Sequence, residues 1–582
     1  MRRPLRKPHG LKMEDIDNWE ETASYIIHQD GAINIAIDGD TGKELSRNTD
    51  FATVFNAASA ALATAGAGGL IFIKKGTYTI STGLTALSSI NIRGESRKGT
   101  ILFNDTAGYA LTVSVPGYKD WGGGIYDLQF LGDDEAETGD DGGQVTVISA
   151  QHYSIHNCLF WFSNGTAVNL DECYLTDIRD CYFRINTGTC IDINDETNSC
   201  TGTIIEHCQF GNNNSDYCIE IKDSDSNWIL ENWFETSTKD CGGIRITDGS
   251  QYTHITRNRF HALGDAKHGI QIDGTDALVT DTRIECNTMS GFTTTGNCID
   301  ITGGETRRMH IINNTFRTIN DNVFESNQDC ADMIFRGNRF DEVTGRGINN
   351  SNFNGLIISD NFFYHVGGYC VYCSYARPCT ITGNVSKECT GGGFRLSSLT
   401  RGCVVANNAV YDNTGIAYEI QDSSYYILSG NVALNGNADG FQLNDHTYCN
   451  IIGNISSDDQ GTPTQTKGFE FTGTNSNNII IGNRAEGNTA NEFQGHTGQV
   501  GTILQYNIGE VTENGGTSAV IADGATIAHG LTGTPTQVSA VGSVAGEIVQ
   551  VTAIGAANLT IAIKNNAGAA GTNQAIYWRA WL

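Results

Sequence analysis

The stretch IRDCYFRINTGTCIDI, residues 178–193, contains two short segments in which apolar and variable residues alternate. The stretch IEHCQFGNNNSDYCIEI, residues 205–221, repeats this pattern one step further along the chain. In both stretches the first segment reads Ile-x-x-Cys-x-Phe and the second reads Cys-Ile-x-Ile. Alternation with a period of two places the apolar side chains on one side of a β-strand and the variable ones on the other. Each repeat therefore predicts short strands with one buried face.

The first segment recurs along most of the chain, and Asn replaces Cys at its fourth position from Asn232 onward. The residues at this position are Cys158, Cys181, Cys208, Asn232, Asn258, Asn287, Asn314, Asn338, Asn361, Asn384, Asn408, Asn431, Asn454 and Asn483. The thirteen steps from Cys158 to Asn483 average about 25 residues. Coils this short cannot bury a face alone, whereas stacking pairs each strand with a neighbour above and below. We therefore predict an all-β fold, a right-handed parallel β-helix over residues 68–508, in which Asn side chains hydrogen-bond along the axis.

Composition agrees with many turns and an acidic surface. The chain has 69 Gly and only 6 Pro, as expected where tight turns join strands that need their N–H groups. Its formal charge of −29 argues against nucleic-acid binding, which needs basic patches. We find no apolar run of about 18 residues and predict no membrane span. The basic N-terminus lacks a following apolar segment, so we expect no secretory signal peptide. We interpret most of the 17 Cys as small buried thiols.

Three further regions flank or enter the repeat. Residues 1–49 are predicted to be an N-terminal arm or anchor. Residues 50–67 are predicted to form a helix that caps the end of the stack, with Asp50 as its N-cap and Phe51, Val54 and Phe55 on one face. Residues 512–582 contain short β-branched runs separated by Gly and Asn and are predicted to form a small β-sandwich.

The segment from Asp50 to Ser81, with its helix followed by GGLIFIKKGTYTIS, resembles the entry module of pectate-lyase-like β-helix proteins, which include viral tailspikes. The phrases HGLTGTPTQV (529–538) and IYWRAWL (576–582) resemble C-terminal modules of phage and archaeal-virus tail proteins. The resemblance implies a homotrimer located in the virion tail or outside the cell. It also implies a polysaccharide partner and attachment to other virion proteins through the arm. The C-terminal module would trimerise the chain, bind a receptor, or cap the stack.

The outward positions of the Ile-x-Ile strands are the first place to look for chemistry. Asp192 and Glu220 lie one coil apart, and this spacing is close to that of a retaining glycosidase pair. Lys222 and Arg245 add cationic groups beside them, as a lyase acting on uronic acids requires. We predict Asp192, Glu220, Lys222 and Arg245 to be catalytic. The same columns, and the polysaccharide groove that the resemblance implies, predict substrate binding by Gln271, Asp300, Tyr372 and Arg395.

Two alternatives to this interpretation stay open. Charges of opposite sign on a solvated strand face are also ordinary cross-strand pairs. No cofactor is required, although Asp192, Glu220 and Asp273 together offer the oxygen ligands that Ca²⁺ prefers.

In the irregular middle, residues 322–376, we expect Glu325, Asn350 and Cys373 at inward positions.

The sequence thus favours a tailspike or tail-fibre type virion protein that binds and degrades a host surface polysaccharide. The first alternative is a cellular, extracellular polysaccharide lyase or hydrolase with the same fold. The second is a structural or adhesin rod without catalysis. A fold of this type hosts all of these functions, so the choice has to come from the site.

Overall fold

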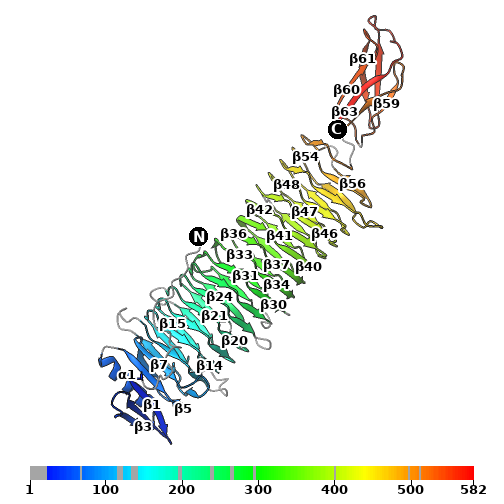
Figure 1. Ribbon diagram of the computed structural model, residues 1–582. Coiled ribbons are helices and arrows are strands. Elements are labelled where there is room, and N and C mark those ends of the chain that lie inside the picture. The colour runs from blue at the N-terminus through cyan, green and yellow to red at the C-terminus, as the bar shows by residue number, and fades with distance from the viewer. Residues whose placement is uncertain are drawn as a thin grey trace. The chain divides into compact units, whose positions relative to one another are not determined.

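The computed structural model describes residues 22–65, 68–114, 122–132, 142–194, 200–215, 217–235, 241–261, 268–292, 296–398, 401–495, 499–509, 513–531 and 533–581. By its internal contacts the chain divides into two compact units, 1–305 and 306–582. Each unit is described by itself. Both contain three parallel sheets, A, B and C, and every coil contributes one strand or a short pair of strands to each sheet (Figure 1).

The first unit begins with a hairpin and the chain's capping helix. Its first elements are β1 (Tyr25–Asp30), β2 (Ile33–Asp38), β3 (Glu44–Asn48) and α1 (Phe51–Ala65). In α1 the face with Phe51, Val54 and Phe55 is buried, and the backbone N–H of Thr53 donates to Asp50 Oδ2 at 2.9 Å. This hydrogen bond is an N-cap of the predicted kind.

The second half of the expected arm is part of the folded structure. Strand β1 pairs in parallel with β4 (Gly69–Ile73) of sheet A and antiparallel with β2. The prediction of an arm over residues 1–49 is therefore wrong for residues 25–48. The physical reason is that a β-helix end exposes an unpaired strand edge, and the hairpin covers it.

The coils of the first unit follow in a fixed order, A then B then C. Sheet A continues with β7 (Ile90–Gly94), β10 (Gly124–Tyr126), β13 (Ser154–His156), β16 (Asp177–Arg179), β19 (Ile204–Glu206), β22 (Trp228–Leu230), β25 (His254–Thr256), β28 (Val279–Thr280) and β29 (Arg283–Glu285). Sheet B has β5 (Gly76–Ile80), β8 (Thr100–Asn104), β11 (Gln129–Leu131), β14 (Leu159–Trp161), β17 (Tyr182–Arg184), β20 (Gln209–Gly211), β23 (Trp233–Glu235), β26 (Arg259–His261) and β30 (Thr288–Phe292). Sheet C has β6 (Leu84–Leu87), β9 (Leu111–Ser114), β12 (Val145–Ile148), β15 (Val168–Asp171), β18 (Ile191–Asn194), β21 (Tyr217–Lys222), β24 (Gly242–Thr247), β27 (Ile270–Asp273) and β31 (Ile299–Thr302).

The second unit repeats this order. Its sheet A has β32 (Thr306–Arg307), β33 (His310–Ile312), β36 (Cys330–Arg336), β39 (Phe353–Ser359), β42 (Cys379–Thr382), β45 (Val404–Ala406), β48 (Ile427–Ser429), β51 (Asn450–Ile452), β54 (Ile479–Ile481) and β57 (Ile503–Gln505). Sheet B has β34 (Thr315–Ile319), β37 (Arg339–Val343), β40 (Phe362–Val366), β43 (Val385–Lys387), β46 (Ala409–Tyr411), β49 (Val432–Leu434), β52 (Ile455–Ser457) and β55 (Arg484–Glu486). Sheet C has β35 (Phe324–Ser326), β38 (Ile348–Ser351), β41 (Val371–Ser374), β44 (Phe394–Ser397), β47 (Tyr418–Gln421), β50 (Phe441–Asn444), β53 (Lys467–Thr472) and β56 (Asn491–Gln494).

Stacked apolar side chains fill the interior of the coils. The Phe column of sheet B places Phe183 between Phe160 and Phe210, with ring centroids 4.9 and 5.0 Å away and rings within 7° of parallel. All three are fully buried. Because the coils share one register, each inward residue meets its counterpart in the next coil, and the core is a set of columns.

The predicted Asn ladder lies at the turn between sheets A and B. Asn408 Nδ2 donates to the carbonyl of Ile381 at 2.9 Å and to Asn431 Oδ1 at 3.0 Å. Its own Oδ1 accepts from the backbone N–H of Asn384 at 3.0 Å. Each amide therefore satisfies backbone groups that the turn leaves without strand partners.

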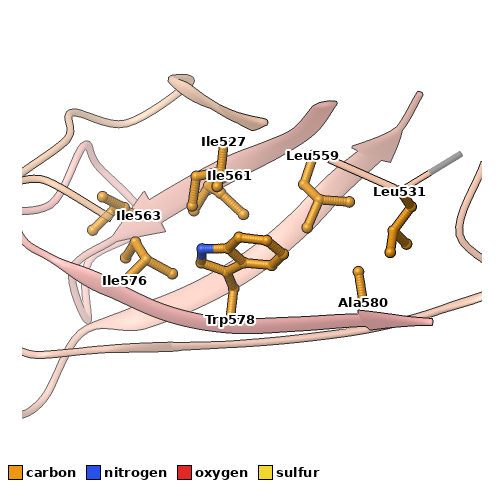
Figure 2. Close-up of a cluster of buried hydrophobic side chains, with 8 residues drawn as sticks. All are labelled: Ile527, Leu531, Leu559, Ile561, Ile563, Ile576, Trp578 and Ala580. Carbon is orange, nitrogen blue, oxygen red and sulfur yellow. The ribbon is translucent and has the colours of Figure 1, made fainter. Parts of the chain in front are cut away.

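The C-terminal module consists of two antiparallel sheets. One contains β58 (Glu513–Thr517), β63 (Ile576–Trp581) and β60 (Gln537–Gly542), and the other β59 (Thr526–Ala528), β62 (Asn558–Lys564) and β61 (Ile548–Ile554). Their inner faces enclose a small core in which Trp578 lies among Ile561, Leu559 and Ile576 (Figure 2). This arrangement agrees with the predicted sandwich.

The cysteines are mainly core residues. Of the described free thiols all but Cys286 are buried, as expected. Cys379 and Cys403, on neighbouring coils, form a disulfide that the sequence did not suggest. No helix among the described residues has the length and apolar character needed to cross a bilayer.

Candidate functional site

The outward face of sheet C in the first unit carries a column of polar residues. Parallel pairing aligns Asp192 of β18 with Glu220 of β21, and Glu220 with Arg245 of β24. Lys222 follows Glu220 by two residues on β21 and so projects from the same face. The flanking isoleucines point inward and are fully buried, which fixes this alternation. The structure therefore brings together all four residues that the sequence predicted to be catalytic.

These side chains form one wall of a pocket with a volume of about 320 Å³. The pocket is lined by Asp192, Asn194, Glu220, Lys222, Arg245, Thr247, Asp248, Asp273 and Asp276. Five of these residues are acidic and two are basic, so the pocket carries an excess of negative charge.

Arg245 joins two carboxylates of the pocket. Its guanidinium lies 3.0 Å from Asp273 Oδ2 and 3.7 Å from Glu220 Oε1. Burial alone lowers the pKa of Arg245, but the hydrogen bond that it donates to Asp273 and the charge of Glu220 outweigh burial and raise the pKa. Burial raises the pKa of Asp273, while the hydrogen bonds from Thr275 and Arg245 outweigh this effect and lower it. Arg245 and Asp273 thus stay charged, and Arg245 links Asp273 to Glu220.

Asp192 has the opposite electrostatic environment. Burial raises its pKa to about 7, the charge of Glu220 adds to the rise, and Lys222 opposes it. Glu220 Oε1 lies 3.7 Å from the Arg245 guanidinium, and Glu220 Oε2 accepts from Thr189 Oγ1 at 3.0 Å. Near neutral pH the pocket therefore presents Asp192, which readily holds a proton, beside the arginine-paired Glu220.

A carboxylic acid and a carboxylate on adjacent strands are the two groups that glycoside hydrolysis needs. Adjacent parallel strands are ~4.8 Å apart. This separation is close to the ~5 Å found between the carboxyl groups of retaining glycosidases. The arrangement can donate a proton to a glycosidic oxygen while a negative charge faces the sugar carbon.

The carboxylate oxygens of Asp192, Glu220 and Asp273 are also predicted ligands of Ca²⁺. Arg245 lies between Glu220 and Asp273, so two of the three expected ligands are already paired with a cation. In the described parts of the chain, the one group of three ligand atoms that lie within 4.8 Å of one another is Glu206, His207 and Glu231, outside this pocket. Calcium binding by Asp192, Glu220 and Asp273 stays a prediction.

Two predicted binding residues continue the column beyond the pocket. Gln271 pairs in register with Arg245 and donates to Thr302 Oγ1 at 3.4 Å. Asp300 follows it, but only 6% of its surface is exposed. Asn297 donates to Asp300 at 2.8 Å. Asp300 is therefore a largely covered residue of the outward column, 3.5 Å from His268 Nε2, and substrate binding by Gln271 and Asp300 stays a prediction.

The other two predicted binding residues lie in the second unit and form a group of their own. Tyr372 of β41 aligns with Arg395 of β44, whose guanidinium lies 5.5 Å from the Tyr372 ring. Arg346 lies 4.1 Å from the same ring. Arg395 also lies 5.5 Å from the ring of Tyr369, which donates to Glu419. Arg346 and Arg395 thus both make cation–π contacts with the Tyr372 ring, and substrate binding by Tyr372 and Arg395 stays a prediction.

One expected irregularity of the middle coils is absent. Glu325 was predicted to point inward, but it pairs in register with Asn349, on the outward side, while Phe324 and Ser326 point inward. Asn349 Nδ2 donates to Glu325 Oε1 at 3.0 Å. The repeat pattern places this strand one residue out of register, and a one-residue shift turns every side chain to the other face. Asn350 and Cys373 are buried, as expected.

Sequence reasoning missed the loop residues of the pocket. Thr189 precedes β18, whereas Asp248 and Asp276 follow β24 and β27. Asp248 occupies a left-handed turn position that Glu172, Asp223, Asp422 and Asp445 occupy in other coils, so the position recurs although its contact with the pocket does not follow from the repeat. Lys222 is paired with Asp248 at 3.7 Å, which directs it along the wall of the pocket.

Fold and site define the class: a right-handed parallel β-helix protein with a polar pocket on one of its sheets. Residues 242–410 and 346–524 match the family model of the right handed beta helix region. Comparison with curated proteins gives no match.

Among solved structures the chain is similar to the surface protein and adhesin PfbA of Streptococcus pneumoniae, with 12% identity, a TM-score of 0.38, and coverage of 64% of this chain and 96% of that one. It is also similar to the tailspike of Escherichia coli bacteriophage HK620, with 12% identity, a TM-score of 0.37, and coverage of 92% and 90%. A third is DFA-IIIase of Arthrobacter chlorophenolicus A6, with 11% identity, a TM-score of 0.36, and coverage of 64% and 83%. These likenesses are distant, and the assignment of the fold rests on the strand pairing of this chain.

Proposed function

We propose that this protein binds a polysaccharide along sheet C of its first unit and hydrolyses a glycosidic bond in the pocket at Asp192 and Glu220. The observation that carries the proposal is the raised pKa of Asp192 directly beside an arginine-paired carboxylate. A carboxyl group that is unusually easy to protonate, beside a second carboxyl group, is a common sign of an acid and its catalytic partner.

In the proposed reaction the protonated Asp192 donates its proton to the glycosidic oxygen as the bond to the sugar carbon breaks. Glu220 attacks that carbon and forms a glycosyl ester. Water, deprotonated by the now anionic Asp192, then breaks the ester and restores both groups. The strand separation favours this double displacement, and we expect the product to retain its anomeric configuration.

The charge of the pocket favours hydrolysis over a lyase reaction and a neutral glycan over a uronate. A lyase needs a cation that is free to neutralise the carboxylate of the sugar. Arg245 is already paired with Glu220 and Asp273, and Lys222 lies 3.7 Å from Asp248. With five acidic lining residues against two basic ones, the pocket repels an anionic sugar.

We place this activity in a tailspike or tail-fibre type protein of a virion tail that assembles as a homotrimer. In this proposal the N-terminal arm attaches the chain to other virion proteins. The tailspike of bacteriophage HK620 was solved with a hexasaccharide, and the fold likeness to it is distant. The alternative is a cellular, extracellular hydrolase with the same pocket. The organism that produces the chain would decide between the two.

The test is a release assay on panels of neutral and uronate-containing surface polysaccharides. New reducing ends without absorbance near 235 nm are expected, whereas absorbance at that wavelength would identify a lyase. Asp192→Asn and Glu220→Gln are expected to abolish release, and Glu285→Gln, on sheet A and paired with Arg283, is the matched control. Binding of a glycan without any product would contradict the catalytic proposal and leave a binding rod.

A further inference from the structure

The outward face of sheet A in the second unit has no charges over five successive coils. The outward residues of β42, β45, β48, β51 and β54 are Thr380, Thr382, Val404, Ala406, Ile427, Ser429, Asn450, Ile452, Ile479 and Ile481. Isoleucines of this face are well exposed: Ile427 to 40% and Ile452 to 41%. Exposed isoleucines in columns leave apolar surface in water at a cost of about 25 cal/mol per Å².

The same positions in the first unit include five charged residues: Asp177, Arg179, Glu206, Arg283 and Glu285. There the outward residues of β13, β16, β19, β22, β25 and β29 are Ser154, His156, Asp177, Arg179, Ile204, Glu206, Trp228, Leu230, His254, Thr256, Arg283 and Glu285. Ion pairs run between them, such as Arg179 with Glu206 at 3.1 Å. The fold therefore accepts charges at these positions, and their absence in the second unit is a property of that unit's surface.

The turn between sheets A and B shows the same contrast. In the first unit its left-handed position is occupied by side chains that include Asp180, His207 and Glu231, each with φ of 55°. In the second unit Gly453 and Gly482 occupy it, and a Cβ added to either would meet nothing within 4 Å. Crowding inside the protein thus does not require these glycines. Their effect is to leave the outer surface smooth, so that another backbone can approach closely.

Sheet B continues this surface around the turn. Its first outward column contains Val385, Ala409, Val432 and Ile455 over four coils, and in the fifth coil the charged Arg484 follows in register. We use the name uncharged corner for three sets of residues together. They are the outward residues of β42, β45, β48, β51 and β54, the turn residues 383, 407, 430, 453 and 482, and the sheet B residues Val385, Ala409, Val432 and Ile455. Tyr425 and Tyr448 lie just before β48 and β51 and stack on each other at 5.1 Å, although both are more than half exposed.

We infer that the uncharged corner is the surface through which copies of this chain associate with one another. This inference rests on the oligomer in the proposed function and assigns its contact surface. Two copies, each with a formal charge of −29, repel each other except where carboxylates are absent. Among the described residues of the corner, the outward positions of sheet A present no charge over five successive coils and those of sheet B over four. Since all copies share the same coil spacing, their columns match coil for coil.

The size of the corner fits a stable contact. Five coils at ~4.8 Å and a width of about seven residues at ~3.3 Å give about 550 Å² per copy. Two copies then bury about 1,100 Å², just above the ~1,000 Å² that a biological interface should clear. The stacked tyrosines at its edge enlarge this area.

The experiment measures the mass of the full chain in solution by sedimentation velocity over a range of concentrations. Wild type is expected to be an oligomer. Ile427→Asp and Ile452→Asp each place like charges in the contact and are expected to weaken association by ~100-fold. The matched control is Trp228→Asp, since Trp228 holds the same register position of sheet A in the first unit and is 41% exposed. It is expected to leave the mass unchanged.

A mixing experiment separates loss of contact from loss of fold. Ile427→Lys alone is expected to be dissociated, and an equimolar mixture with Ile427→Asp is expected to regain a mixed oligomer. A monomeric wild type, or oligomers that persist in both Asp variants, would overturn the inference. Glycan release measured on the same samples reports on the pocket separately, because the variants leave all pocket residues in place.

Discussion

Replacing Asp192 by Asn changes how the stability of the protein depends on pH. Burial and then the charge of Glu220 raise the pKa of Asp192 from 3.8 to about 7 in the folded state. Between these values the folded chain holds one proton more than the unfolded chain, so the stability that this group contributes is present below pH 4. It is lost as pH rises through 7. About three pKa units at about 1.4 kcal/mol each set an upper limit of about 4 kcal/mol.

The variant has no titrating group at this position and escapes the loss. We expect Asp192→Asn to unfold at a higher temperature than wild type at pH 8, with the gap closing as the pH falls toward 4. Thermal unfolding of both proteins followed by circular dichroism across this range measures the gap. Glu285→Gln, which removes a carboxylate from sheet A outside the pocket, is the control and should follow the wild-type curve.

A constant gap between wild type and Asp192→Asn over the whole pH range would refute the reasoning. It would mean that Asp192 keeps an ordinary pKa in the folded state. The carboxyl group would then be ionised at neutral pH, and its role as a proton donor would fall with it.

Three further predictions follow from single groups. Glycan release by the wild type should decline above pH 7 as Asp192 loses its proton, which a pH–rate profile measures; a rate that rises steadily to pH 9 would speak against an acid at this position. Burial lowers the pKa of His446 to about 4, so stability falls as pH drops from 6.5 to 4 by up to about 3 kcal/mol. His446→Gln should unfold with a weaker dependence on acid in this window, and an unchanged acid profile would contradict the assignment. Asn408→Ala removes hydrogen bonds to Ile381 and Asn431 and should cost about 3 kcal/mol in the free energy of unfolding, whereas the exposed Asn491→Ala should cost less than about 0.5 kcal/mol. Equal effects of the two Asn variants in chemical denaturation would show that the ladder adds no stability.

Much of the fold can be read from the period of the sequence because each coil repeats the same contacts. The Ile, Phe and Asn positions recur every 25 residues or so, and stacking then fixes which residues meet. Errors arose where this repetition ends or changes. The hairpin of β1 and β2 has no repeat, so its pairing with β4 was not foreseen. In strand β35 the repeat pattern is weak, so the prediction was one residue out of register and put Glu325 on the inward face.

The sequence by itself determined the columns, including the alignment of Asp192, Glu220 and Arg245 on adjacent strands. Periodic residues have their neighbours set by the repeat, so spacing along the chain translates directly into distance. Only the tertiary structure decided which of these charges are neutralised and which are not. Arg245 is paired with Asp273, and Asp192 is buried and unusually easy to protonate. Those properties depend on how side chains of neighbouring coils and turns, such as Lys222 and Asp248, meet around the pocket, and on burial, which is a property of the assembled coils.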